Sequence, residues 1–181
     1  MLHSLLLPVF AALLLAGCAN PLNRATSDRY AEQCASANAA GRLSEAEQAC
    51  YRAAVNVDWG NLGPELKSQR MYNLGLIKRK TGKFSEAEFL LRESLGIEET
   101  LTGNSSLKVA RRLVELSATL AELKRWDDGL PYLKRVVSIN PAFAGNERDF
   151  TRLVYTEYSK ALRQLGKPED ALAFEDAARG L

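Results

Sequence analysis

The chain has 181 residues, of which 46% are hydrophobic and 25% charged, so it is long and apolar enough to bury a core rather than remain disordered. Lysine and arginine number 24 against 22 aspartate and glutamate residues, a balance that argues against nucleic acid as the partner. The single histidine is His3, and removal of a signal peptide would leave no imidazole for catalysis or metal binding.

Residues 1–17 have the composition of a signal peptide. The apolar run Leu5–Ala16 is shorter than the roughly 18–20 residues that a membrane-spanning helix needs. It ends in the sequence Leu-Ala-Gly-Cys at residues 15–18, which resembles the lipobox of bacterial lipoproteins. The resemblance implies cleavage before Cys18 and acylation of this cysteine with fatty acids such as palmitate. An ordinary secretory signal followed by a chance cysteine is the alternative.

The residue after Cys18 indicates the membrane in which a lipoprotein is anchored. Lipoproteins retained in the inner membrane typically have Asp there, whereas this chain has Ala19, so the resemblance implies an outer-membrane anchor with a periplasm-facing domain. Residues 18–26 are expected to form the acylated cysteine and a short tether. At about 3.3–3.6 Å per extended residue, this tether would keep the domain at residues 27–181 within roughly 30 Å of the membrane surface.

The body of the chain is an internal repeat. The segment Gly41–Glu47 recurs as Gly82–Glu88, and the segments Lys124–Gly129 and Gly166–Ala171 occupy the same phase, at intervals of 41, 42 and 42 residues. Such a period is typical of stacked units that cannot bury an apolar face alone. The 6 prolines and 12 glycines gather at the boundaries, so the units are predicted to be helical hairpins. Their expected limits are residues 27–64, 65–105, 106–145 and 146–181.

Local signals place the helices within these units. In the second unit a helix is predicted from Glu65 to Thr81, with Pro64 suited to its first position. Gly145 or Asn146 is expected to start the fourth pair. Small residues recur at one position of the second helix of each unit, which predicts close packing there: Ala46, Ala87, Gly129 and Ala171.

Two serines are expected to cap second helices. Ser44 is followed by Glu47, and Ser85 by Glu88, three residues later in each case. This spacing is typical of a capping box, in which the two side chains bind backbone amides of the first turn.

These units resemble the tetratricopeptide repeat. The family has Leu-Gly midway along the first helix, then a turn glycine, an aromatic residue and a small residue, which match Leu74, Gly75, Gly82, Phe84 and Ala87. The 42-residue period is closer to the kinesin-light-chain subtype than to the 34-residue form. The resemblance implies an all-α, right-handed superhelical solenoid of about four helix-turn-helix units over residues 27–181. Another kind of helical-hairpin array is the alternative.

The same resemblance places the first helix of each unit along a concave groove. Ala31 and Ala35 stand where some family members hold the terminal carboxylate of a peptide, and they have no donor, so binding of a chaperone tail is not expected. The candidate residues of a partner-binding groove are Gln69, Tyr72, Asn73, Leu76, Arg79, Lys80, Arg111, Val114, Thr156, Lys160 and Arg163.

Basic residues gather around two of these positions. Lys78–Lys80 with Lys83 form one group, and Arg111 with Arg112 the other. A solvated helix face and a contact for an acidic partner or lipid headgroups are both compatible with this pattern.

Cysteine positions suggest a covalent link. Once Cys18 is assigned to the lipid, Cys34 and Cys50 remain, in a compartment that permits disulfides. They lie on either side of the Gly41 turn, so the hairpin brings them to similar heights on facing helices. A bond between them would close a loop of about 15 residues and stabilise the fold by roughly 3 kcal/mol. Two buried free thiols are the alternative.

No catalytic residue, metal site or cofactor is predicted, because the chain has no nucleophile motif and no glycine-rich phosphate loop. The leading hypothesis is a lipid-anchored protein–protein interaction scaffold of the bacterial cell envelope. It would hold or assemble other envelope proteins or peptides, such as secretion, pilus or wall-synthesis machinery, with no small-molecule substrate. The alternatives are an envelope enzyme such as a wall hydrolase and a purely structural envelope protein.

Overall fold

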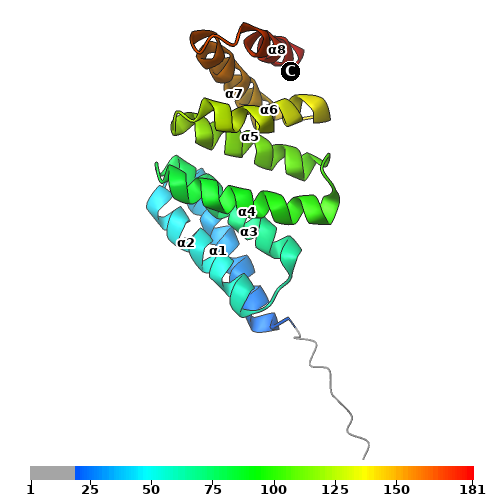
Figure 1. Cartoon of the computed structure of the whole chain (residues 1–181). Helices are drawn as coiled ribbons and strands as arrows, with labels where there is room; N and C mark the ends of the chain where they lie inside the picture. Colours follow the sequence, from blue (N-terminus) through cyan, green and yellow to red (C-terminus); the bar gives the residue numbers. More distant parts are fainter. Residues whose placement is uncertain (1–18) are drawn as a thin grey trace, which may run out of the picture.

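The computed structural model describes residues 19–181, which form eight α-helices in four antiparallel pairs (Figure 1). The signal peptide and Cys18 lie outside the described residues. The pairs are α1 Pro21–Ala39 with α2 Leu43–Trp59, α3 Pro64–Lys80 with α4 Phe84–Thr102, α5 Leu107–Glu122 with α6 Trp126–Ile139, and α7 Gly145–Gln164 with α8 Pro168–Gly180.

The pairs stack in chain order. Figure 1 shows α1 and α2 at one end of the molecule and α7 and α8 at the other, and each pair contacts the next along the chain. The expected all-α solenoid of four helix-turn-helix units is therefore confirmed. Between residues 19 and 181, no helix has the length and apolar character needed to cross a membrane.

Each hairpin turns at one residue with a left-handed backbone. Gly41, Gly82 and Gly166 have φ angles of 72°, 76° and 74°, and Lys124 takes 59° at the equivalent place. The amide of the next residue donates to a carbonyl five residues earlier in all four turns, which closes the end of the first helix. The repeat period in the sequence thus marks the positions where the chain reverses.

The helix limits agree with the prediction in the second and fourth units and differ in the first. α3 begins at Pro64 and α7 at Gly145. The tether predicted at residues 18–26 is too long, because α1 already begins at Pro21. Asn20 caps this helix by accepting a hydrogen bond from the amide of Leu22 at 3.0 Å, and proline is favoured at the first helical position.

The capping boxes predicted at Ser44 and Ser85 are wrong. α2 and α4 begin one residue before these serines, and their N-cap residues make no side-chain hydrogen bond. The two glutamates bind cations instead, and three of these four cations lie more than 30 residues away in the chain. Glu47 accepts from Lys78 and Lys83 at 2.8 and 2.6 Å, and Glu88 accepts from Arg92 and Arg125 at 2.9 and 2.6 Å.

The apolar core differs between the two ends of the solenoid. A large cluster joins α4 to α8 and contains leucines with Tyr155, Tyr158 and Phe174. A separate cluster under the first hairpin is built mainly of small side chains, and it includes Cys34 and Cys50. A disulfide joins these two cysteines, whose Cα atoms are 5.1 Å apart. The bond therefore lies in a small part of the core that is built mainly of small side chains.

Candidate functional site

A pocket of about 310 Å³ opens between α3 and α5, on the face where the groove is expected. Four residues from the predicted groove set meet in it, namely Gln69, Tyr72 and Asn73 of α3 and Arg111 of α5. Tyr72 is half-buried, and the guanidinium of Arg112 lies 5.0 Å from the centre of its ring. The full lining is Glu65, Gln69, Tyr72, Asn73, Glu98, Lys108, Arg111 and Arg112.

The floor of this pocket is a buried ion pair. Arg112 and Glu98, at 4% and 1% exposure, join Nη2 to Oε2 at 2.8 Å. Arg112 also donates to the hydroxyls of Ser94 and Ser68 at 2.7 and 2.9 Å, and Ser68 donates to Glu98 at 3.0 Å. Burial lowers the pKa of Arg112, and the charge of Glu98 opposes that shift. The pair fixes the geometry of the pocket from below.

One acceptor on this floor is unused. Among the described residues, Glu98 Oε1 is buried and has no hydrogen-bond partner, and Lys108 Nζ lies 3.8 Å away. An unsatisfied buried acceptor costs about 1–3 kcal/mol, so the pocket favours an occupant that brings a hydrogen-bond donor.

A second, smaller recess of about 40 Å³ adjoins the first and leads to α7. Tyr72 and Arg111 line both spaces, so they form the wall between them. Arg111 pairs with Glu147 at 2.6 Å. The remaining lining of the recess is Val114, Glu115, Phe143, Glu147, Phe150 and Thr151.

An ion pair continues along the same face. Arg79 Nη2 lies 2.8 Å from Glu115 Oε2, and its guanidinium lies 4.9 Å from the centre of the Phe150 ring. Burial raises the pKa of Glu115, while the charge of Arg79 and its hydrogen bond work in the opposite direction. Arg79 therefore helps to pack α3 against α5 and α7, and its charge is already paired with Glu115.

Other predicted groove residues lie outside the pocket. Val114 is 2% exposed and belongs to the core, so it offers almost no surface to a partner. Lys80 donates to Asn38 at 2.8 Å, at the far end of α3. Leu76 is half-buried and lines neither the pocket nor the recess.

The groove residues predicted on the fourth unit do not line the pocket. Thr156 and Lys160 line a separate shallow depression between α7 and α8. Arg163 makes two hydrogen bonds of 2.8 Å to Glu175, which lower the pKa of that carboxyl to about 2. The predicted groove residues that share a pocket therefore lie on α3 and α5, and α7 contributes to the adjoining recess alone.

The basic area predicted around Lys78 is neutralised within the fold. Lys78 and Lys83 both bind Glu47, and Lys78 also binds Glu86 at 2.5 Å. Burial alone would raise the pKa of Glu47, but the hydrogen bonds from the two lysines outweigh it and lower the pKa to about 2. With Arg112 buried as well, these residues do not present an open cationic surface.

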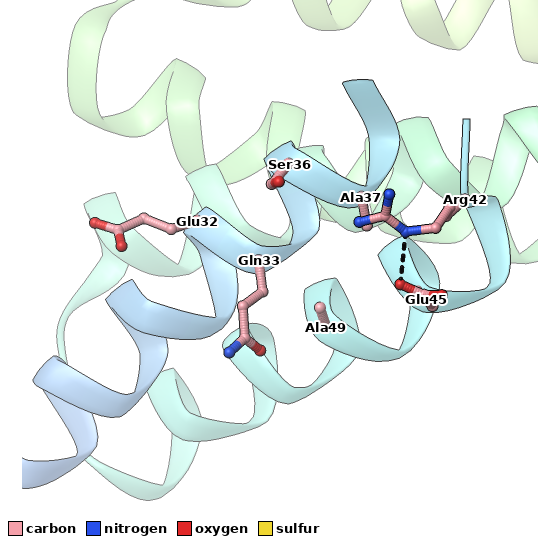
Figure 2. A pocket seen from close by; sticks show the side chains of 7 residues that line it. All are labelled: Glu32, Gln33, Ser36, Ala37, Arg42, Glu45 and Ala49. Carbon is pink, nitrogen blue, oxygen red and sulfur yellow. Dashed lines mark hydrogen bonds and ion pairs between the residues drawn. The ribbon is translucent and has the colours of Figure 1, made fainter. Parts of the chain in front are cut away.

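A larger hollow of about 430 Å³ lies on the exposed side of α1 and α2 (Figure 2). Figure 2 shows Glu32 and Gln33 pointing apart, and the contact drawn there is the 2.8 Å ion pair of Arg42 with Glu45. The polar side chains that line it are exposed and none is held on a buried network. This surface has the character of the polar end cap that a solenoid needs for solubility.

The buried network under the pocket was not predicted, although the repeat period contains its signal. Ser27 and Ser68 are 41 residues apart, and Arg70 and Arg112 are 42 apart. The hydrogen bond between arginine and serine also recurs, since Arg70 donates to Ser27 at 3.2 Å and Arg112 donates to Ser68. Polar residues that recur in phase with a helical repeat thus indicate a ladder between successive first helices.

The architecture is that of a tetratricopeptide-repeat solenoid. Residues 68–101 match the tetratricopeptide repeat family. The crystal structure of BtubC (BKLC) from P. vanneervenii is similar, with a TM-score of 0.75 and 18% identity over 87% of this chain and 63% of that chain. The chain thus spans less than two thirds of the length of that protein.

A second similar structure is a protein from Podosopora anserina with nearly identical TPR-like repeats. Its TM-score is 0.66 and its identity 17%, over 85% of this chain and 74% of that chain. At these identities both structures establish the fold alone. No curated protein sequence matches the chain.

Proposed function

We propose that this protein is a lipid-anchored scaffold of the bacterial cell envelope, and that the pocket between α3 and α5 holds a segment of another envelope protein. The solenoid architecture supports a protein-interaction role in general terms. The observation that carries the proposal is the pocket floor, where a buried carboxylate oxygen of Glu98 lies ready to accept a hydrogen bond. Holding a secretion, pilus or wall-synthesis complex together is the role that fits this arrangement.

The pocket indicates the chemistry of the segment it would bind. Lys108 pairs with Glu65, Arg111 with Glu147 and Arg112 with Glu98, so the lining has little net charge. Tyr72 offers an aromatic surface beside the open acceptor. A segment with an amide or ammonium side chain for Glu98 and a neighbouring apolar side chain for Tyr72 satisfies both features.

The pocket predicts a specific loss of binding. Gln69→Trp should fill the space without touching the core, because Gln69 is exposed and lines the pocket. The yield of the main cross-link to the partner in cells is expected to fall at least about tenfold, which corresponds to about 1.4 kcal/mol. Cross-linking with a photoreactive residue at Asn73 and mass spectrometry would identify and quantify the partner.

A matched variant separates binding from folding. Glu93 is exposed on α4 and lines neither the pocket nor the recess, so Glu93→Trp should leave the cross-link unchanged. Both variants should keep the helical signal in circular dichroism. Full cross-linking by Gln69→Trp would mean that the partner binds elsewhere.

The anchor is tested at Cys18, which lies outside the described residues. The Leu-Ala-Gly-Cys sequence supports acylation, so a labelled fatty acid should be incorporated into the wild-type chain. Cys18→Ser should abolish the label completely and leave the signal peptide uncleaved by the lipoprotein peptidase. A wild-type chain without label would reject the lipid anchor while leaving the binding pocket untouched.

A further inference from the structure

The start of α1 is tied firmly to the end of α2. The backbone amide of Asn20 donates to the carbonyl of Gly60 at 2.9 Å, and the side chain of Asn23 donates to that of Asn56 at 3.2 Å. A Cβ atom placed on Gly60 would lie 2.5 Å from Cβ of Asn23, so the two segments are in close contact. The chain therefore enters the domain at a fixed point and not through a loose linker.

This entry point is very close to the proposed lipid. Asn20 is two residues after Cys18, so their Cα atoms are at most about 7.6 Å apart. In Figure 1 the start of α1 lies at the opposite end of the solenoid from α8. Acyl chains on Cys18 would therefore hold this end of the domain, and no other, at the bilayer surface.

The two most exposed large apolar side chains of the described residues belong to this end. Trp59, the last residue of α2, is 77% exposed, and Leu22 in the first turn of α1 is 76% exposed. Single exposed apolar residues are ordinary on a protein surface. Two such residues next to the point where the chain enters the domain call for an explanation, because no part of the described fold covers either side chain.

Charged side chains near this end are held in ion pairs. Arg24 and Arg70 both pair with Asp28, and Lys67 pairs with Asp58 at 2.9 Å. The first turn of α1 contains no acidic residue. A surface that is close to neutral and carries exposed indole and leucine side chains suits lipid headgroups through apolar contact, and not through attraction to anionic lipids.

We infer that Trp59 and Leu22 form a second membrane contact, which rests in the headgroup region and sets the orientation of the lipid-anchored solenoid. Tryptophan is enriched at membrane interfaces, where its ring meets the acyl chains and its N–H meets water. The contact rests on the proposed lipid at Cys18, which supplies the high local concentration that lets two side chains suffice. It places the α1–α2 end of the solenoid at the bilayer and the α7–α8 end away from it.

Tryptophan fluorescence tests this contact directly. The chain has two tryptophans, so Trp126→Phe leaves Trp59 as the single reporter. The lipidated full-length product is reconstituted in neutral phosphatidylcholine vesicles. The emission of Trp59 should shift to shorter wavelength, and lipids brominated near the headgroup end of the acyl chain should quench it. Raising the salt concentration to 1 M should leave the quenching unchanged.

A second reporter serves as the control. Tyr51 is 59% exposed on α2 and lies eight residues before Trp59, about 12 Å along the helix. In the Trp59→Phe, Trp126→Phe chain, a Tyr51→Trp reporter should be quenched by aqueous iodide and not by brominated lipid.

The possible results separate the contact from the anchor. If the chain carries lipid and sediments with the vesicles while Trp59 stays open to iodide and unquenched by brominated lipid, the membrane contact is wrong and the anchor stands. If mass spectrometry finds no lipid on the wild-type chain, both are wrong. Quenching that disappears at high salt would also overturn the apolar contact inferred here.

Discussion

Gly129→Ala is expected to lower the free energy of unfolding by about 3 kcal/mol or more, because a methyl group there has no room. A Cβ atom at this position would lie 1.7 Å from the hydroxyl oxygen of Tyr158 and 2.9 Å from Cζ. The phenol cannot move away cheaply. It is fully buried, donates to the carbonyl of Ser117 at 2.8 Å, and packs edge-on against Trp126 at 5.1 Å.

The same position carries alanine in the other three units, where Ala46, Ala87 and Ala171 are fully buried. Glycine in the third unit therefore has a specific cause, which is the space taken by the Tyr158 hydroxyl. A double-mutant cycle measures it. Tyr158→Phe removes the hydroxyl, so Gly129→Ala should cost at least about 1 kcal/mol less in that background.

A glycine without a close neighbour provides the control for this cycle. Gly96 is exposed on α4, and no atom lies within 4 Å of a Cβ atom placed there. Gly96→Ala should stabilise the protein by about 0.5–1 kcal/mol through helix propensity alone. Urea unfolding of the variants gives these free energies. Wild-type stability in Gly129→Ala would contradict the packing of α5, α6 and α7 described above.

The sequence-based prediction succeeded where a feature recurs with the repeat. Gly41, Gly82 and Gly166 mark three hairpin turns, and Pro64 and Gly145 mark two helix starts, because each depends on the backbone preferences of one or two residues. The start of α1 was missed although Asn20 and Pro21 form a cap and first position of the usual kind. It was assigned to a tether because it precedes the first full period.

The two capping boxes were predicted wrongly because their glutamates make contacts with residues far away in the sequence. Glu47 and Glu88 suit capping boxes by their spacing from Ser44 and Ser85, but in the fold they bind cations from neighbouring units. Those lysine and arginine residues are more than 30 residues away from the glutamates in the chain, so no local sequence motif predicts the contacts. An ion pair between two helices competes with a capping hydrogen bond for the same carboxylate. For Glu47 and Glu88, the ion pair determines where the carboxylate lies.

The groove was predicted from the resemblance to the tetratricopeptide repeat, and the structure brings only some of its residues together. Gln69, Tyr72, Asn73 and Arg111 meet in one pocket because successive first helices lie side by side. Thr156, Lys160 and Arg163 do not reach it, because the fourth unit lies farther along the solenoid. Repeat position therefore predicts which face a residue occupies, and the distance between units determines which residues share a pocket.

Loss of the disulfide in the first hairpin is the other large effect expected. Cys34→Ala with Cys50→Ala should lower the free energy of unfolding by roughly 3 kcal/mol, since the bond closes a loop of about 15 residues. The corresponding pairs in other units also touch. Gly75 is packed against Leu91, and Ser159 donates to Glu175 at 2.8 Å. The two cysteines thus occupy a position where the two helices also meet in the second and fourth hairpins.

The first hairpin should depend on this bond more than its neighbours would. Its core consists mainly of Ala37, Ala46 and Ala49 beside the cysteines, and it packs against one neighbouring hairpin. With the bond removed, amide hydrogens of α1 and α2 should exchange well before those of α5 and α7. Reduction of the wild-type protein should reproduce the loss of stability, and reduction of the double variant should change nothing.

Thiol counting decides whether the bond forms in cells. It is done on the denatured, non-reduced chain with Cys18→Ser, so that Cys34 and Cys50 are the two remaining cysteines. No free thiol is expected, because their Cα separation of 5.1 Å is ordinary for a bonded pair. Two free thiols would show that they act as small apolar side chains. The stability of the first hairpin, which holds the start of α1 beside Trp59, would then come from packing alone.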